Sequence, residues 1–323
     1  MGVLGTGSCL PAHVVTNDEV GAPAGVDHEW IHSRTGIRRR RWAKPDEATS
    51  DLAAAAGRAA LEAAGIRGGD LSLVVVATST PDQPQPPTAS AVADLLGAGY
   101  GTTAFDLNAV CSGFVFALST AERMLRATGG YALVVGADIY SRILDPGDRR
   151  SAILFGDGAG AVVLGPARGT GRVHSSRLAG FAAERDLIQV PAGGSRLPAS
   201  DETLREGLHH FTMNGREVRH FVAEKVAPAI SAFLADNGVA PEAVDHFVPH
   251  QANGRMVADL AARVGIPADR MRVTFEEYGN TGSASVPVTL DDAARSGVLK
   301  DGDLLLLAAF GGGMAMGLTL LTW

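Results

Sequence analysis

Cysteine is scarce in this 323-residue chain, which has only Cys9 and Cys111. The two residues lie in dissimilar contexts, and neither has partners at metal-ligand spacing. A disulfide framework or a zinc site is therefore not expected. We predict that the chain binds no metal and that it works in a reducing, cytoplasmic environment.

Long apolar runs and a net positive charge are also missing. The apolar run 304–310 has only the length of a strand and stops at three glycines, and the N-terminus lacks the basic and apolar regions of a signal peptide. The formal net charge of -7 provides no general attraction for nucleic acid or an anionic membrane. We therefore expect a globular protein with neither of these partners.

Short Val-, Ile- and Leu-rich runs alternate with Ala-rich helical segments, which is typical of an α/β protein whose strands are buried on both faces. Residues 50–64 predict a helix and residues 71–77 a strand. The same order of helix, glycine stop and strand returns at 218–236 and 244–248.

The repeat continues in register along the chain. The predicted strand 103–107 leads to a turn at Cys111, and 271–275 leads to a turn at Gly279 and Asn280. The predicted strands 132–136 and 159–165 correspond to the later predicted strands 303–309 and 314–321, respectively. One long-period repeat favours two duplicated halves with stacked sheets over a solenoid, and we place the halves at residues 1–168 and 169–323.

Cys111 follows a predicted strand and directly precedes the predicted helix 114–126. A thiol at a helix N-terminus is expected to have a lowered pKa, which suits a nucleophile. A free cysteine is equally often a small buried hydrophobic residue, and the local sequence leaves both interpretations open. Cys9 has no following helix and is assigned to packing.

His250 stands at the end of the predicted strand 244–248, at the kind of edge where α/β sheets place reactive groups. Asn280 lies in a cluster of small and turn-forming residues that is also typical of a simple turn with a helix cap. The glycine-rich segments 155–161 and 310–313 precede strands and lack a Gly-Lys-Ser/Thr ending, so they do not indicate nucleotide binding. We interpret them as tight reversals that let the backbone approach a ligand or a neighbouring chain closely.

Taken together, these segments resemble β-ketoacyl-acyl carrier protein synthase III of the thiolase superfamily over essentially the whole chain. The motifs that carry the resemblance are Asp27 to Ile31 with Arg34 to Ile37, Cys111 to Phe114, Phe155 to Gly160, Pro249 to Asn253, Gly279 to Thr281 and Phe310 to Gly313. The resemblance implies a thiolase-like fold of two duplicated halves, with two stacked mixed sheets and helices between and outside them.

The resemblance also implies a condensing mechanism. Cys111 would take an acyl group from acyl-CoA, and His250 and Asn280 would stabilise the enolate formed when malonyl-acyl carrier protein loses carbon dioxide. Backbone N–H groups of Cys111 and Gly312 would form the oxyanion hole. No cofactor is implied, because acyl-CoA is a substrate.

Further roles are carried over from the same family. The CoA-binding residues would be Trp30, Arg34, Arg149, Gly215 and Asn253. Arg255 would help to dock the carrier protein, and Pro86, Phe310 and Met314 would line the acyl pocket. A homodimer is implied, with Pro86 near the partner subunit's acyl pocket. Met314 to Met316 replaces a segment that usually has aromatic character in the family, and Pro86 stands where many relatives have a bulky residue. We therefore expect a roomier pocket that accepts primers longer or more branched than acetyl.

Two other functions remain open at this point. The first is a priming ketosynthase of a polyketide or other secondary-metabolite pathway. The second is an acyltransferase of the same fold that does not condense. The presence of His250 and Asn280 beside Cys111 favours condensation over simple transfer.

Overall fold

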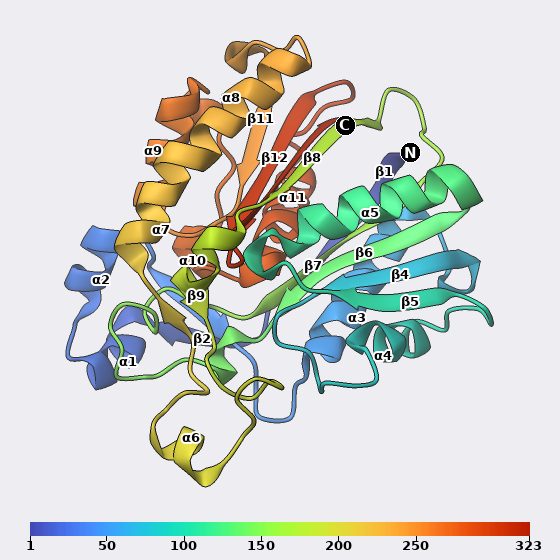
Figure 1. The fold of residues 1–323 in the computed structure, drawn as a ribbon. Helices are drawn as coiled ribbons and strands as arrows, with labels where there is room; N and C mark the ends of the chain where they lie inside the picture. The colour runs from blue at the N-terminus through green and yellow to red at the C-terminus, as the bar shows by residue number, and fades with distance from the viewer.

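The computed structural model describes all of residues 1–323, and two mixed β-sheets form its frame (Figure 1). The first sheet has the order β1-β7-β6-β4-β5, with β1 (Gly2–Cys9), β4 (Leu71–Ala77), β5 (Thr103–Leu107), β6 (Tyr131–Asp138) and β7 (Gly158–Gly165). The second has the order β11-β12-β13-β8, with β8 (Arg172–Gly180), β11 (His246–Pro249), β12 (Leu304–Gly311) and β13 (Ala315–Thr322). The predicted α/β class is confirmed.

The two sheets repeat one topology. From β1 the first sheet makes two antiparallel pairings and then two parallel ones, and from β8 the second sheet makes two antiparallel pairings and then one parallel pairing. In this series β8, β13, β12 and β11 take the places of β1, β7, β6 and β4. The division at residues 168 and 169 falls between β7 and β8, and it stays a prediction.

The predicted strand 271–275 is wrong. Met271 makes only an isolated parallel bridge to Phe247, and Phe275 already begins the short helix α10 (Phe275–Tyr278). The backbone N–H groups of Thr274 and Phe275 donate to Oε1 of the Gln251 side chain, at 2.9 and 3.3 Å. Because a side chain takes these donors, no strand ladder forms where the first sheet has β5.

Helices form a layer between the sheets and a layer outside each of them (Figure 1). The middle layer consists of α5 (Gly113–Thr128) and α11 (Ser285–Arg295). The first sheet is covered by α3 (Thr49–Ala64) and α4 (Thr88–Leu95), and the second by α7 (Gly215–Phe221), α8 (Ala227–Asp236) and α9 (Gly254–Val264). A π-helical turn, Val222–Val226, joins α7 to α8, so the predicted helix 218–236 is continuous and contains a π-helical turn.

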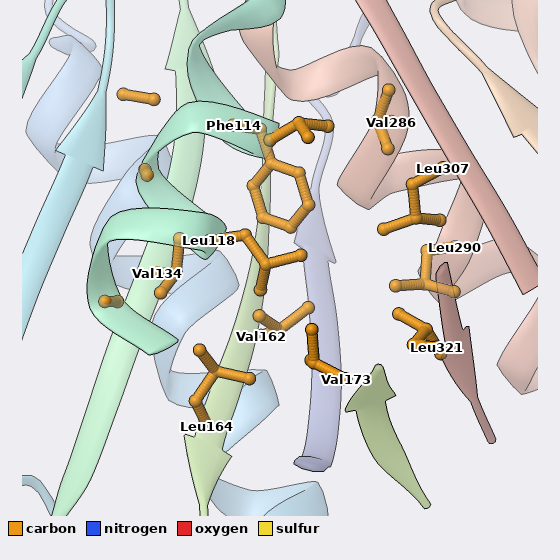
Figure 2. Packing of buried hydrophobic residues seen from close by; sticks show 14 of the residues in the cluster. Phe114, Leu118, Val134, Val162, Leu164, Val173, Val286, Leu290, Leu307 and Leu321 are labelled. Atoms are coloured by element: carbon orange, nitrogen blue, oxygen red, sulfur yellow. The ribbon is translucent and has the colours of Figure 1, made fainter. Parts of the chain in front are cut away.

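The middle layer contains the largest hydrophobic cluster (Figure 2). Phe114, Leu118, Ala121 and Leu125 recur at helical spacing on α5, and all four are buried. Between the sheets they meet side chains of both, including Val134 and Val162 of the first and Leu307 and Leu321 of the second, with Val286 and Leu290 of α11. This shared core fixes the two sheets relative to each other.

Smaller elements lie outside the two large sheets. They are β2 (His13–Thr16) paired with β3 (Arg39–Trp42), α1 (Asn17–Gly21), α2 (His28–Thr35), β9 (Ile188–Gln189) paired with β10 (Thr212–Met213), and α6 (Asp201–Arg205). Between β9 and α6, residues 190–200 have no helix or strand. None of the helices combines the length and the apolar character that a bilayer crossing requires.

Candidate active site

Cys111 sits at a strained junction between a strand and a helix. The chain leaves β5, forms a single 3-10 turn at Val110–Ser112, and enters α5. Val110, directly before the thiol, has a φ of 48°, which is rare for a β-branched residue. An added Cβ on Gly311 would lie 2.8 Å from the Cys111 Cβ, so only glycine lets β12 approach the thiol this closely. Such strain is typical of functional positions.

The expectation of a lowered thiol pKa is wrong. Burial, together with the smaller effect of the negative charge of Asp138, raises the pKa of Cys111 to about 12, and the Tyr140 hydroxyl opposes this only in part. The side chain is 5% exposed, so desolvation of the thiolate outweighs the helix N-terminus. Cys111 is therefore a protonated thiol at neutral pH in the free protein.

His250 directly follows β11 and is almost completely buried. Its Nδ1 lies 2.7 Å from the Ser285 hydroxyl oxygen, and its ring meets Phe310 edge-on at 5.4 Å. Burial lowers the pKa of His250 to about 3. The imidazole is therefore neutral at physiological pH, with one ring nitrogen carrying a proton and the other free to accept one.

Asn280 is held by both its backbone and its side chain. Its N–H donates to the Leu154 carbonyl at 2.8 Å, and its own carbonyl accepts from the Gly156 N–H at 3.0 Å. Its side-chain Oδ1 accepts from the Gly282 N–H at 2.9 Å. Because the oxygen is occupied, the Asn280 side chain presents its NH₂ group as the remaining donor.

The glycine-rich segment 155–160 explains how Asn280 reaches this place. A Cβ on Gly156 would lie 2.3 Å from the Tyr278 carbonyl oxygen, and one on Gly279 would lie 2.6 Å from the Leu154 carbonyl oxygen. The two segments touch only because both positions are glycine. The close backbone approach predicted for this motif is therefore to the loop that carries Asn280.

One cavity of about 520 Å³ brings most of the predicted residues together. Cys111, His250 and Asn280 all line it, and so do these other predicted residues: Trp30, Arg34, Arg149, Gly215, Asn253, Arg255, Phe310 and Met314. Gly311 lines the cavity where Gly312 was expected, with Gly312 next along the chain. Pro86 does not line it; it lies exposed on the loop before α4, so its place in an acyl pocket depends on a second copy of the chain.

The lining of the cavity is cationic although the protein is acidic overall. Five of its residues are arginines, namely Arg34, Arg149, Arg150, Arg219 and Arg255, and none is Asp or Glu. The guanidinium carbons of Arg34 and Arg149 lie 4.2 and 5.7 Å from the centroid of the Trp30 ring. An aromatic face with flanking guanidinium groups suits a ligand that has a planar base and phosphates.

Three of the predicted binding residues also support the local fold. The Asn253 side chain caps α9 by accepting from the Met256 N–H at 3.0 Å. Arg255 donates from Nη2 to the Ser33 carbonyl of α2 at 2.6 Å. Gly215 is the first residue of α7. Each of them therefore positions an element at the cavity as well as lining it.

The sequence interpretation missed several residues that surround the three predicted catalytic side chains. Ser285 was noted only as part of a small-residue cluster, and Ser79, Asp138 and Tyr140 were not singled out. None of these residues belongs to a local chemical motif. Their partners are distant in the chain, as with Ser285 and His250, and only the fold brings them together.

The fold and the cavity define a thiolase-like condensing acyltransferase, and comparison with known proteins specifies the family. Residues 105–180 match 3-Oxoacyl-[acyl-carrier-protein (ACP)] synthase III, and residues 234–323 match the C-terminal part of the same family. The chain belongs to this synthase III family.

Individual relatives match over almost the full length. The chain is 57% identical to acetoacetyl CoA synthase NphT7 of Streptomyces sp. (strain CL190), over 99% of this chain and 98% of the relative. The crystal structure of 3-oxoacyl-[acyl-carrier-protein] synthase III from Aquifex aeolicus VF5 superposes with a TM-score of 0.91 at 35% identity, covering 100% and 99% of the two chains. The priming β-ketosynthase from the R1128 polyketide pathway also has a TM-score of 0.91 at 35% identity, with 99% and 96% covered.

Proposed function

We propose that this enzyme joins an acyl primer to a malonyl thioester by decarboxylative Claisen condensation. The observation that carries the proposal is the convergence of Cys111, His250 and Asn280 on one cavity with a cationic lining. Cys111 attacks the thioester of acyl-CoA and keeps the acyl group, and CoA leaves. The extender then enters the same cavity and loses carbon dioxide.

In this proposal His250 and Asn280 stabilise the enolate that decarboxylation leaves on the extender. Neutral His250 has a single ring proton, and if the Ser285 hydroxyl donates to Nδ1, that proton lies on Nε2 as a donor. The Asn280 NH₂ group is the second donor. The enolate carbon attacks the acyl-Cys111 carbonyl, and the resulting oxyanion accepts from the N–H groups of Cys111 and Gly312.

CoA would lie along the cationic part of the cavity. Trp30 and Arg149 would stack on the adenine, Arg34 would bind phosphate, and Gly215 and Asn253 would border the pantetheine arm. Arg255 would meet the acidic carrier protein at the cavity mouth. We further propose a cytoplasmic homodimer, in which the loop of Pro86 reaches the second subunit. The half-exposed edge strand β5 supports a contact of this kind.

The carrier of the malonyl group has two candidates. The family description favours acyl carrier protein, with the product entering fatty-acid or, as for the priming β-ketosynthase, polyketide synthesis. The relative at 57% identity is an acetoacetyl CoA synthase, which favours malonyl-CoA and an acetyl primer. The roomy acyl pocket predicted from the sequence favours primers longer than acetyl. The test therefore varies both the acyl primer and the malonyl donor.

Intact-protein mass spectrometry tests the proposal. The enzyme is incubated with acetyl-, butyryl- and isobutyryl-CoA, and then with malonyl-CoA or malonyl-acyl carrier protein. We expect one acyl mass to load and to be discharged as β-ketoacyl product. Cys111→Ala should not load, whereas Cys9→Ala, which removes the other thiol, should load normally. Asn280→Ala should load and then condense about 100- to 1,000-fold more slowly.

Two results would contradict the proposal. If the Cys111→Ala variant were acylated, Cys111 would not be the nucleophile. Discharge of the acyl group without release of carbon dioxide from the malonyl donor would identify a simple acyltransferase.

A further inference from the structure

Gln251 lies between His250 and Ala252 and has no part in the chemistry described so far. Both of its neighbours line the cavity, whereas Gln251 does not line it and is 0% exposed. A primary amide that is fully buried needs partners for its two N–H donors and for the lone pairs of its oxygen. The positions of these partners show what the side chain holds in place.

Four backbone groups satisfy the Gln251 amide completely. Nε2 donates to the Pro249 carbonyl at 2.7 Å and to the Arg272 carbonyl at 3.3 Å. Oε1 accepts from the N–H groups of Thr274 and Phe275, at 2.9 and 3.3 Å. Two carbonyls require donors and two N–H groups require an acceptor, so an amide of this length is needed for all four bonds.

These bonds connect the two segments that lead to the proposed enolate donors. Pro249 ends β11 directly before His250, and Phe275 begins α10, which ends two residues before Asn280. Because α10 is a single helical turn, the place of Phe275 largely determines where the chain reaches Asn280. Gln251 therefore ties the end of the His250 strand to the start of the Asn280 loop.

No other hydrogen bond makes this connection close to the site. The backbone pairing of the two segments ends where the Arg272 N–H donates to the Phe247 carbonyl at 2.8 Å. Between residues 249–253 and residues 273–280, every hydrogen bond is made by the Gln251 side chain. Its amide thus takes over from the backbone at the point where the segments diverge.

The spacing of the two donors matters for the proposed condensation. The Nε2 proton of His250 and the NH₂ group of Asn280 would stabilise charge on the same thioester oxygen, so their separation decides whether both bonds form. A misplacement of about 1 Å can cost roughly 100-fold in rate. A residue that fixes this separation would affect catalysis without touching the substrate.

We propose that Gln251 is a positioning residue that sets the separation of His250 and Asn280; this rests on the proposed function. By holding residues 272–275 against the end of β11, it directs both donors at one oxygen of the extender. Acyl loading does not depend on it, because Cys111 follows a strand of the first sheet and the proposed loading step uses neither donor.

Half-reaction kinetics of Gln251→Met test this role. Methionine has a similar length and no amide, so it occupies the space and breaks all four hydrogen bonds. We expect acyl loading on Cys111 to stay within about twofold of the wild type. Condensation, measured per loaded site, should slow by about 10- to 100-fold. Quenched-flow mass spectrometry with acyl-CoA and then with the malonyl thioester measures both steps.

Two further variants separate positioning from general stability. Gln251→Glu keeps the size of the side chain but has at most one proton to donate, so at least one carbonyl loses its partner. It is measured if Gln251→Met does not fold, and the same split between loading and condensation is expected. Phe233→Leu alters a buried residue of α8 away from the cavity. It should lose stability and keep both wild-type rates per loaded site.

A double-mutant cycle with Asn280→Ala adds a readout that a purely structural role would not change. Once the Asn280 amide is gone, the separation of two donors no longer matters. We therefore expect the Gln251 substitution to slow condensation by no more than about threefold in the Asn280→Ala background.

The positioning role is overturned if the folded Gln251 variant condenses at the wild-type rate, or if its loading and condensation slow equally. It is also overturned if the effects of the Gln251 and Asn280 substitutions multiply in the double variant. A wild-type enzyme that never loads an acyl group, or that discharges it without release of carbon dioxide, would instead refute the proposed function.

Discussion

The pair formed by His250 and Ser285 illustrates how a single hydroxyl can set the proton positions of a buried site. Both side chains are nearly inaccessible, and the Gln251 N–H also approaches the Ser285 oxygen, at 3.4 Å. With that N–H directed at its lone pairs, the Ser285 hydroxyl is free to donate its proton to Nδ1. In that orientation Ser285 holds His250 in the tautomer with its proton on Nε2, which the proposed condensation uses.

Replacing Ser285 with alanine should therefore affect one half-reaction only. Nδ1 loses its partner in a buried site, which costs about 1–3 kcal/mol and slows condensation roughly 5- to 150-fold. Acyl loading on Cys111 should stay within about twofold of the wild type, measured by mass spectrometry beside steady-state condensation. Ser283→Ala, which removes a buried hydroxyl bonded to the Ala77 carbonyl, is the control. Equal losses in loading and condensation would indicate a general structural defect.

At the scale of residues, the sequence predicted which side chains lie together in the cavity better than it predicted their pKa values. Cys111, His250 and Asn280 do line one cavity, because each lies in a recognisable motif next to a strand or helix end. The direction of the Cys111 pKa shift was wrong, because it depends on burial and on Asp138, which follows 27 residues later. Such properties arise only when the chain is folded.

At the scale of elements, α5 links the proposed nucleophile to the core. The helix begins just after Cys111, and its apolar face packs between both sheets (Figure 2). Leu118 is 1% exposed in the centre of that face. Its neighbours come from two sheets and α11, so they are not free to close a gap at this point.

Leu118→Ala should lower the free energy of unfolding by about 2–5 kcal/mol, because it leaves a cavity in the middle layer. Thr128→Ala, at the exposed end of the same helix, should change it by no more than about 0.5 kcal/mol. Urea denaturation followed by circular dichroism measures both. If Leu118→Ala lowered the free energy of unfolding by no more than Thr128→Ala does, the two sheets would be able to close around the gap.

Element boundaries were predictable where apolar runs were strong. The strands 71–77 and 103–107 have the expected limits, because buried strands read as continuous runs of Val, Ile and Leu or end at clear turns. The segment 271–275 failed because Gln251, some twenty residues earlier, supplies the acceptor that a neighbouring strand would provide. No local pattern encodes a bond of that kind.

At the scale of the whole molecule, the charge distribution is uneven. The formal net charge is -7, yet the cavity lining has five arginines and no carboxylate. The general field of the protein does not attract an anionic substrate, so the local field of these arginines must do so. The composition predicted the negative sign of the net charge, whereas the cluster of arginines at the cavity is formed only in the folded chain.

Raising the ionic strength should therefore weaken binding of acyl-CoA without changing the chemistry. Between about 0.01 and 0.5 M salt the screening length falls from about 30 Å to below 8 Å, and we expect KM for acyl-CoA to rise several-fold with kcat nearly constant. A short acyl thioester without the nucleotide is the control and should show no such rise. Equal salt effects on both substrates would exclude the arginine cluster as the cause.

The site draws its members from both sheets: Cys111 follows β5 of the first, whereas His250 follows β11 of the second and Asn280 lies just before α11. In the proposed mechanism, neither set can catalyse condensation by itself. A shift of one sheet by about 1 Å relative to the other, along the middle layer, would leave every helix and strand intact. It would still misalign the three side chains and greatly reduce activity. The turnover rate therefore reports how accurately the two sheets pack against each other. It responds to smaller displacements than any measurement of secondary-structure content can detect.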